Sequence, residues 1–503
     1  MATLPIDVLL NIPQFIDDPK DLLALALTAH IFYSEIVPKH IDYRRISCRK
    51  SSEKVWKHLS ESPYTRHVWY LNIMESGYPI WMIPRVCAVD QQTTERVDRK
   101  DFDLDTFVQA LSKMSNLKVL KFSIEGSIEK TICAISRALG EAGCELEELE
   151  TNFLLPPNMK YFFKRSGAIK GSQGCLLFCK HWPSLKKCII APSGSYPNSD
   201  FNSGLQMLLN APNLTHMYMN SSGVSPSILS ACWPNLEHLT ICCGVEFQRG
   251  KTETEYILSL RTFFSRHPKL ITLSTQNIII PGWTIESDDF LPNLTSLRLA
   301  FPWGFNNHNI NSGSVITSNM AGHLTHLDMS ILLLSFLKKH RAPLPSVDSC
   351  YYPGVYLEKS TIQDLSETIP NITKLYVTFA YRRIPRPNRG LNISTNSWQR
   401  QLTVNEKLEL STILLTSFKG LKVLLGPFDN LSIVSDDYSL SKVLYKSPSL
   451  LYTRAIWESG TACLLIRLTR DSVMEKMNYE CVAHPGPTEC DMRSWSGFYE
   501  RTS

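Results

Sequence analysis

The chain has 503 residues, of which 43% are hydrophobic and 20% are charged. This length predicts several domains or a repeat array, and the composition excludes a mainly disordered chain and a coiled coil. The 52 basic and 47 acidic residues nearly balance, so the charge does not favour nucleic acid or an anionic membrane as a partner.

The sequence contains no recognisable targeting or membrane segment. Residues 1–7 lack the basic start of a secretory signal, and the longest apolar runs, 22–27 and 331–334, are too short to cross a bilayer. The 14 cysteines are scattered and include no C-x-x-C pair, which is typical of proteins whose cysteines stay reduced. We therefore expect a soluble protein of the cytoplasm, the nucleus or both.

Residues 1–46 are predicted to form three short helices. The first follows Pro5 and is limited by Pro13, the second starts at Pro19, and the third ends before Pro38. The second helix is apolar nearly all round, which predicts that most of its sides are buried. A segment of this size cannot enclose so much apolar surface alone, so we expect a partner to cover part of it. The alternative is that these helices pack on the rest of the chain.

Two motifs in this segment carry a resemblance to a known family. Leu-Pro-x-Asp-Val-Leu-x-x-Ile is followed by Asp-Leu-Leu-Ala-Leu-Ala-Leu-Thr-Ala-His-x-Phe, and together they resemble an F-box. The resemblance implies a three-helix module that docks on the linker subunit of an SCF-type ubiquitin ligase and, through it, on a cullin. The residues expected to bind the linker are Leu4, Pro5, Val8, Leu9, Ile12, Phe15, Leu22, Leu25 and Phe32.

The rest of the chain contains internal repeats. Four eight-residue near-copies begin at Pro212, Pro234, Pro292 and Pro370, and they share the pattern L-x-x-L-x-[LIVM]. Its last two apolar positions are two residues apart, as in a strand with one face on a core. Weaker copies begin at Val68 and at Leu117, Leu146, Leu185, Leu270, Leu324, Leu421 and Leu450.

Helix-like stretches lie between these copies, so the sequence predicts an α/β solenoid. These stretches are 103–114, 132–139, 205–209, 255–266, 362–367 and 408–418. We expect irregular leucine-rich repeats, with a parallel sheet of eleven or twelve strands on one face and helices on the other. The interval between copies varies from 22 to 49 residues. The combination with an F-box resembles fungal proteins of that type, and the alternative is an ordinary α/β domain. The predicted organisation is an F-box in 1–46, a linker and degenerate repeat in 47–100, the solenoid in 101–460, and a cap or tail in 461–503.

The residues between the apolar strand positions are expected to face outward and to bind a protein target. They are mixed, polar and partly aromatic, which fits a folded protein or peptide better than nucleic acid. His216 and His238 occupy the same slot in successive repeats, where simple surface polarity is the alternative to a metal or titrating pair. The candidates on the sheet are His216, Tyr218, His238, Arg298 and Tyr376.

Two insertions provide further target-binding candidates. Trp303 and Phe305 lie in an aromatic, Asn-rich loop, and Arg382, Arg383 and Arg386 lie in a proline-containing loop. The arginines suit a phosphate or acidic motif, whereas a solvated loop and a nuclear import signal are the alternatives.

Motifs for catalysis are missing from the sequence. It has no H-E-x-x-H, G-x-S-x-G or G-x-G-x-x-G motif, and no paired set of metal ligands. We therefore expect no cofactor and no metal. The prediction is a non-catalytic adaptor that brings a protein target to a ubiquitin ligase, and the alternative is a scaffold that uses the same folds without causing degradation.

Overall fold

The chain is described from a computed structural model, in which two compact units comprise residues 1–270 and 271–503. Each unit is treated by itself. The described residues are 5–16, 19–49, 52–74, 82–88, 103–125, 128–154, 183–193, 211–221, 230–243, 253–276, 291–300, 318–328, 334, 343–352, 358–377, 382–383, 399–400, 403–425, 444, 447, 449–456, 463–471 and 476–483.

The first unit begins with a helical module, defined here as residues 5–41. Its expected ends at Pro13 and Pro19 are confirmed, since one helix ends just before Pro13 and the next starts at Pro19. The third α-helix ends at Ile36, but the chain then continues through Pro38 in a wider π turn. Pro38 is accommodated because the first turn of a helix needs no amide hydrogen. The elements are α1 (Ile6–Asn11), η1 (Ile12–Phe15), α2 (Pro19–Ala26), α3 (His30–Ile36) and η2 (Val37–Ile41).

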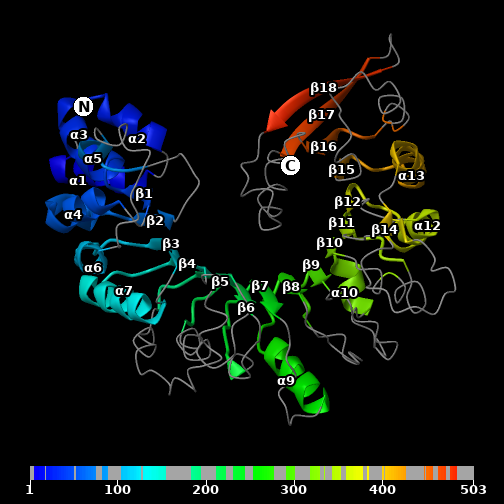
Figure 1. The fold of residues 1–503 in the computed structure, drawn as a ribbon, viewed down its shortest axis with the longest axis horizontal. Coiled ribbons are helices and arrows are strands. Elements are labelled where there is room, and N and C mark those ends of the chain that lie inside the picture. Colours follow the sequence, from blue (N-terminus) through cyan, green and yellow to red (C-terminus); the bar gives the residue numbers. More distant parts are fainter. Residues whose placement is uncertain are drawn as a thin grey trace. The chain divides into compact units, whose positions relative to one another are not determined.

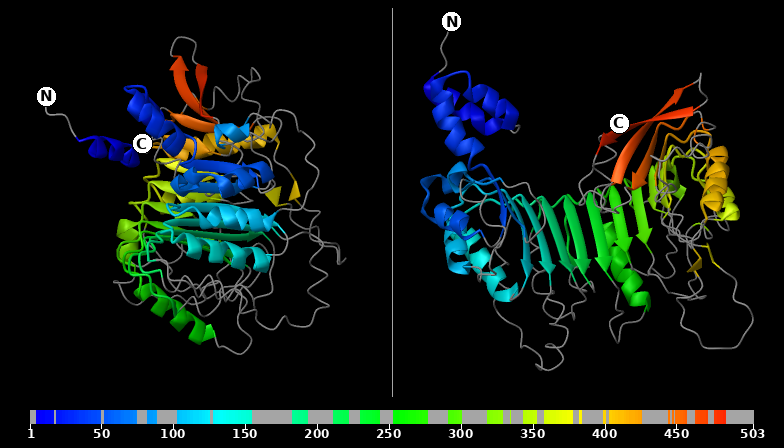
Figure 2. Two further views of the ribbon diagram at one scale, coloured as in Figure 1. Left: turned by 90° about the vertical axis from the view of Figure 1, so that its left-hand side faces the viewer. Right: turned by 45° about the horizontal axis from the view of Figure 1, so that its top comes forward.

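A parallel sheet follows the module, and its strands lie side by side in chain order (Figures 1 and 2). The repeats bury side chains at alternate strand positions, as Leu214, Met217 and Met219 illustrate. This burial confirms the predicted strand pattern, in which alternate side chains face the core. The strands of the first unit are β1 (Arg45–Arg49), β2 (Tyr70–Met74), β3 (Val119–Glu125), β4 (Glu148–Leu154), β5 (Lys187–Ser193), β6 (His216–Ser221) and β7 (His238–Cys243).

The Pro-Asn-Leu start of the repeats has a structural reason. The Asn213 side-chain amide donates to the Pro183 carbonyl of the preceding repeat at 2.7 Å, and Asn235 donates to the Pro212 carbonyl at 3.3 Å. The leucine amide closes the turn, since Leu214 N–H donates to the Ala211 carbonyl. The motif therefore ties each turn to the one before it, which satisfies backbone groups that the sheet leaves open.

Helices lie on one side of these strands (Figure 1). The predicted helices at 103–114, 132–139 and 255–266 are present with small differences in their ends, and the one at 205–209 lies outside the described residues. The elements of this layer are α4 (Glu53–Glu61), η3 (Pro63–His67), α5 (Arg85–Ala88), α6 (Leu104–Ser112), α7 (Ile128–Ala142) and α9 (Glu253–Ser265).

Arg44 joins the helical module to the sheet. Its buried guanidinium donates from Nη1 to the carbonyls of Pro13, at 3.3 Å, and Ile16, at 2.5 Å, and lies 5.4 Å from the centre of the Trp69 ring. Its backbone carbonyl accepts from the amides of Trp69 and Tyr70. The helical module is therefore attached to β2 through hydrogen bonds in addition to the covalent chain.

The second unit repeats the same plan. Its parallel strands are followed by two antiparallel ones, β17 and β18, within the predicted cap or tail. Its strands are β8 (Thr272–Gln276), β9 (Ser296–Ala300), β10 (His326–Asp328), β11 (Ser349–Tyr352), β12 (Lys374–Val377), β15 (Val423–Leu425), β16 (Tyr452–Ile456), β17 (Cys463–Asp471) and β18 (Lys476–Ala483), with a separate pair β13 (Arg382–Arg383) and β14 (Gln399–Arg400). Its helices are α10 (Ser318–His323), α12 (Lys359–Thr368) and α13 (Val404–Ser417).

Two of the parallel strands, β1 and β11, were not predicted from the sequence, and neither were the antiparallel strands β13, β14, β17 and β18. β1 begins at Arg45, so the predicted boundary after residue 46 falls inside a strand. β11 lies in the 48-residue interval between Leu324 and Ile372, where Val347 and Cys350 replace the usual leucines. Among the described residues, no helix is long and apolar enough to cross a membrane.

Candidate functional site

The helical module has a small core of its own. Leu22, Ala26, Ile36 and Val37 are buried together, and Ile16, Leu25, Phe32 and Ile41 pack against them in part. These contacts come from α2, α3 and the turns that follow each of α1 and α3. The module is therefore held together by its own side chains.

The same module leaves large apolar side chains in water. Phe15 is 83% exposed and Leu27 is 72% exposed. Of the eleven large apolar residues that the described part of the chain exposes, six come from this short stretch. Exposed apolar side chains concentrated in this way make the module a candidate binding surface. The six residues are Val8, Phe15, Leu23, Leu27, Ile31 and Tyr33.

The residues predicted to bind a linker fall into different environments. Pro5, Val8 and Phe15 are exposed, and Leu9 and Ile12 are half-buried. Leu4 lies outside the described residues. The prediction that Leu22 lies on a docking surface is wrong, because its side chain is only 1% exposed, and Leu25 and Phe32 pack against the same core.

Sequence reasoning missed four of the exposed residues and overestimated the burial of α2. Leu23 on this helix and Leu27, directly after its last residue, lie one turn apart and are both exposed, so only one side of α2 is buried within the chain. An all-round apolar helix does not reveal which side packs inward. The other two missed residues are Ile31 and Tyr33 on α3.

The outward side chains of the first sheet form rows across the strands. In one row Glu148, Lys187, His216 and His238 are register partners on β4, β5, β6 and β7. A second row, two residues further along each strand, contains Lys121, Glu150, Ile189, Tyr218 and Thr240. The structure therefore brings together His216, Tyr218 and His238 on adjacent strands, as predicted.

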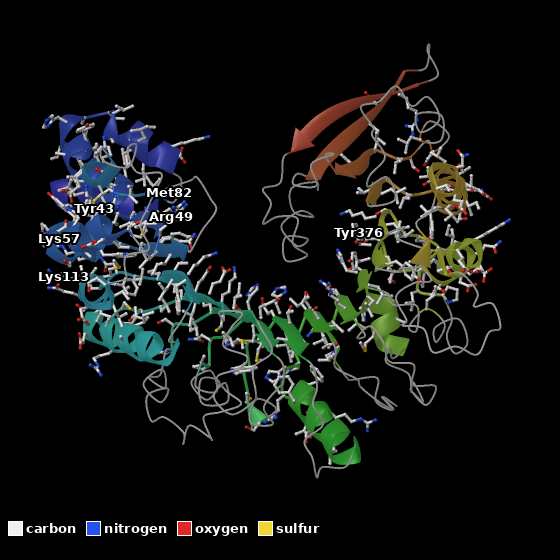
Figure 3. The ribbon with its side chains drawn as sticks, viewed as in Figure 1. Tyr43, Arg49, Lys57, Met82, Lys113 and Tyr376 are labelled. Atoms are coloured by element: carbon white, nitrogen blue, oxygen red, sulfur yellow. The ribbon has the colours of Figure 1, made fainter. Side chains whose placement is uncertain are left out.

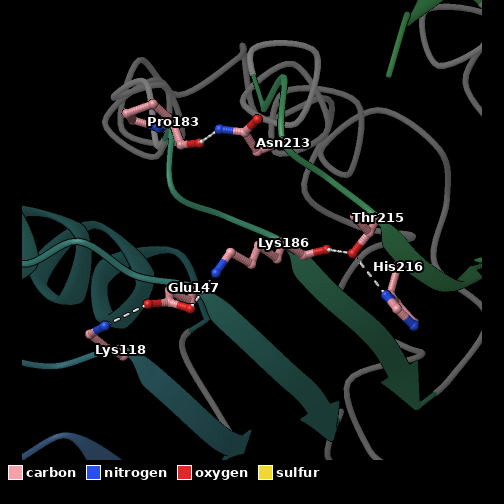
Figure 4. A network of polar contacts seen from close by, with 7 residues as sticks. All are labelled: Lys118, Glu147, Pro183, Lys186, Asn213, Thr215 and His216. Atoms are coloured by element: carbon pink, nitrogen blue, oxygen red, sulfur yellow. Dashed lines mark hydrogen bonds and ion pairs between the residues drawn. The ribbon is translucent and has the colours of Figure 1, made fainter. Parts of the chain in front are cut away.

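Charged side chains on β3–β5 pair with one another (Figure 4). Glu147, just before β4, bridges Lys118 at 2.7 Å and Lys186 at 2.8 Å, which lowers the pKa of its carboxyl. Lys121 pairs with Glu150 at 3.0 Å on the strands themselves. These charges are satisfied within the chain, so this part of the surface needs no partner.

The two histidines on β6 and β7 stack against each other. Their ring centres are 4.2 Å apart and their planes differ by 22°. Burial lowers the pKa of both, that of His216 to about 4, so both rings are neutral near pH 7. Rings stacked face to face direct their lone pairs along nearly parallel planes, which suits a flat contact surface better than convergence on one metal ion.

Thr215 holds the ring of His216 in place (Figure 4). Its hydroxyl oxygen lies 3.0 Å from the Lys186 carbonyl oxygen and 2.9 Å from Nδ1 of His216. In the second unit, the hydroxyl of Thr325 contacts Nδ1 of His326 in the same way.

The second sheet carries an aromatic group on its outward row. The rings of Tyr351 and Tyr376 stack with centres 4.6 Å apart, and the guanidinium of Arg298 lies 5.6 Å from the centre of the Tyr351 ring. Figure 3 labels Tyr376. The predicted residues Arg298 and Tyr376 are thus brought together by Tyr351. Tyr351 was missed because it belongs to β11, whose repeat lacks the leucine pattern.

Of the five target-binding candidates predicted in loops, the structure describes only Arg382 and Arg383, and these two lie outside the parallel sheet. Arg382 and Arg383 form β13, whose backbone pairs with β14. Trp303, Phe305 and Arg386 lie outside the described residues. Within the described ranges, no group of three or more potential metal ligands occurs. Comparison with known proteins finds no family model and no curated protein sequence that matches this chain.

Proposed function

We propose that this protein is the target-recognition adaptor of an SCF-type ubiquitin ligase, with the helical module as its F-box and the repeats as an irregular leucine-rich-repeat solenoid. The observation that carries the proposal is the set of exposed apolar residues on the module, led by Phe15 and Leu27. The sequence motifs that resemble an F-box occupy the same residues.

The two properties of the module suit docking into a foreign groove. Its own core, centred on Leu22 and Ile36, keeps it folded, while its exposed leucines remain available to a partner. Helices that insert an apolar face into a groove are a common mode of recognition. Covering one exposed leucine contributes roughly 1.5–3 kcal/mol to binding.

The outward sheet rows are the proposed target surface. They present rigid aromatic and hydrogen-bonding side chains, such as the stacked His216 and His238 and the stacked Tyr351 and Tyr376. Tyrosine and arginine are the residue types that most often carry binding energy at protein interfaces. The target is a folded protein or a peptide.

Catalysis then belongs to other subunits of the ligase, and this chain contributes proximity. The contacts of Arg44 attach the docking module to the sheet of the first unit. Attachment of two binding surfaces to one body raises the effective concentration of the target near the ubiquitin carrier.

The substitution Leu27→Asp tests the docking step in the full-length chain. It places a charge at the exposed end of α2, directly after Ala26, and is expected to weaken linker binding at least ~10-fold, because a carboxylate cannot enter an apolar groove without cost. The measurement is the affinity for the linker–cullin pair, together with co-purification. Leu258→Asp is the matched control, since Leu258 on α9 is also exposed, at 64%, and lies outside the module.

Two results would contradict the proposal. One is no binding of the linker by the wild-type chain, and the other is equal binding by the wild type and Leu27→Asp. Ubiquitin transfer to a captured target separates a ligase adaptor from a scaffold, since a scaffold would bind the linker without supporting transfer. Point variants are preferable to deletion of residues 1–46, because that deletion would also remove part of β1.

A further inference from the structure

The segment from Met82 to Cys87 folds back from the sheet to the first strand. The amide of Ser47 on β1 donates to the Met82 carbonyl at 2.7 Å, and the amide of Met82 donates to the Ser47 carbonyl at 3.2 Å (Figure 3). This short bridge covers the middle of β1 at the edge away from β2, and it fixes the position of the segment.

An arginine then ties the same segment to the helical module. Arg85, the first residue of α5, holds the Asp42 carboxylate at 2.8 Å, just after η2. The Asp42 carboxylate and, to a smaller extent, the Tyr33 side chain on α3 raise the pKa of Arg85, so Tyr33 also lies close to its guanidinium. Segment 82–87 therefore lies beside the module although some forty residues separate the two in sequence.

The segment adds apolar surface where it meets the module. Val86 is 66% exposed, and Met82 is exposed as well. Tyr33, which lies close to Arg85, belongs to the six exposed apolar residues of the module. The polar groups that hold the segment in place are used within the chain. The side chains of Met82 and Val86, by contrast, point to water and contribute little to the folding of the segment.

We propose that Met82 and Val86 extend the docking surface of the module and contact the same linker subunit. The argument is that the two exposed surfaces are continuous. Arg85, which directly precedes Val86, pairs with Asp42 at the end of the module and lies close to Tyr33. This inference rests on the proposed function. It implies that the docking surface is composite: the F-box-like stretch supplies most of it, and a segment inserted after β2 supplies the rest.

The experiment measures linker affinity for full-length variants. Val86→Asp and Met82→Asp are each expected to weaken binding about 3- to 10-fold, while Leu258→Asp, equally exposed but on α9, leaves it unchanged. Thermal unfolding checks that each variant remains folded, which is expected because both side chains are exposed.

A double-mutant comparison tests continuity directly. Tyr33→Asp and Val86→Asp, which alter neighbouring residues, are expected to be non-additive, whereas Tyr33→Asp and Leu258→Asp are expected to add.

The outcomes separate this inference from the proposed function. If Leu27→Asp loses binding while Val86→Asp and Met82→Asp match the wild type, the extension is wrong and the adaptor role stands. If the wild-type chain does not bind the linker, both fail. If crosslinking places another segment of this chain on Val86, that residue is covered internally and the extension is also wrong.

Discussion

The helical module and the outward face of the first unit's sheet expose different kinds of side chain to water. The module exposes Phe15, Leu23 and Leu27, which nothing in the described chain covers. The sheet face instead pairs its charges, as in the Lys118–Glu147 contact, and its histidines are neutral and stacked. Under the proposed function, this difference suits two kinds of partner. An apolar surface favours a long-lived complex, whereas a self-satisfied polar surface stays soluble alone and suits a partner that binds and leaves.

The largest expected effect tests the division within the module between core and surface. Leu22→Ala is expected to lower the free energy of unfolding of the module by about 2–5 kcal/mol, because it leaves a cavity in the core formed with Ala26, Ile36 and Val37. Leu23→Ala, one residue away and exposed, should change it by no more than about 0.5 kcal/mol. Hydrogen exchange of the α2 and α3 amides measures both, and equal effects would contradict the assignment of core and surface.

A smaller effect tests whether the sheet histidines are neutral. The folded-state pKa of His216, about 4, lies below its ordinary value of 6.5. Between these two values the unfolded chain binds a proton that the folded chain does not, so stability falls as the pH falls from about 6.5 towards 4. His216→Gln removes this group, so the free energy of unfolding should fall less steeply as the pH is lowered. The slope should decrease by an amount equivalent to the binding of up to about one proton on unfolding.

The measurement for His216 is denaturant unfolding of the full-length chain from pH 7.5 to 4.5. Tyr218→Phe on the same strand is the control, because it does not alter the histidine pair. Identical pH dependence for His216→Gln and the wild type would show that the ring is not held neutral by its surroundings.

The smallest expected effect concerns the ion pairs on the sheet. Glu147→Gln removes the partner of Lys118 and Lys186 and is expected to cost less than about 1 kcal/mol, since these side chains are partly exposed. The cost should shrink further at 1 M salt. Glu148→Gln is the control, because the distance between Glu148 and Lys187, 3.7 Å, is longer than the Glu147 ion-pair distances. An effect above 2 kcal/mol would mean that this surface depends on its charges for folding.

The sequence predicted much of the repeat architecture because its signal is local and recurs. Leu236, Leu239 and Ile241 show the pattern in full, and all three are buried. Prediction failed where the pattern was diluted: β11 uses Val347, Cys350 and Tyr352, each of which also occurs in many other settings. The stacked Tyr351 was lost from the candidate site for that reason.

The sequence by itself determined that the chain would begin with three short helices and continue as repeated strands, because prolines, apolar spacing and the Pro-Asn-Leu turns act within a few residues of one another. The tertiary structure alone decided which side of α2 is buried and which faces water. It also decided that residues 82–87 lie beside the module, and that Arg298, Tyr351 and Tyr376 stack. These outcomes depend on contacts between residues far apart in the chain, and the spacing of residues along the sequence does not specify them.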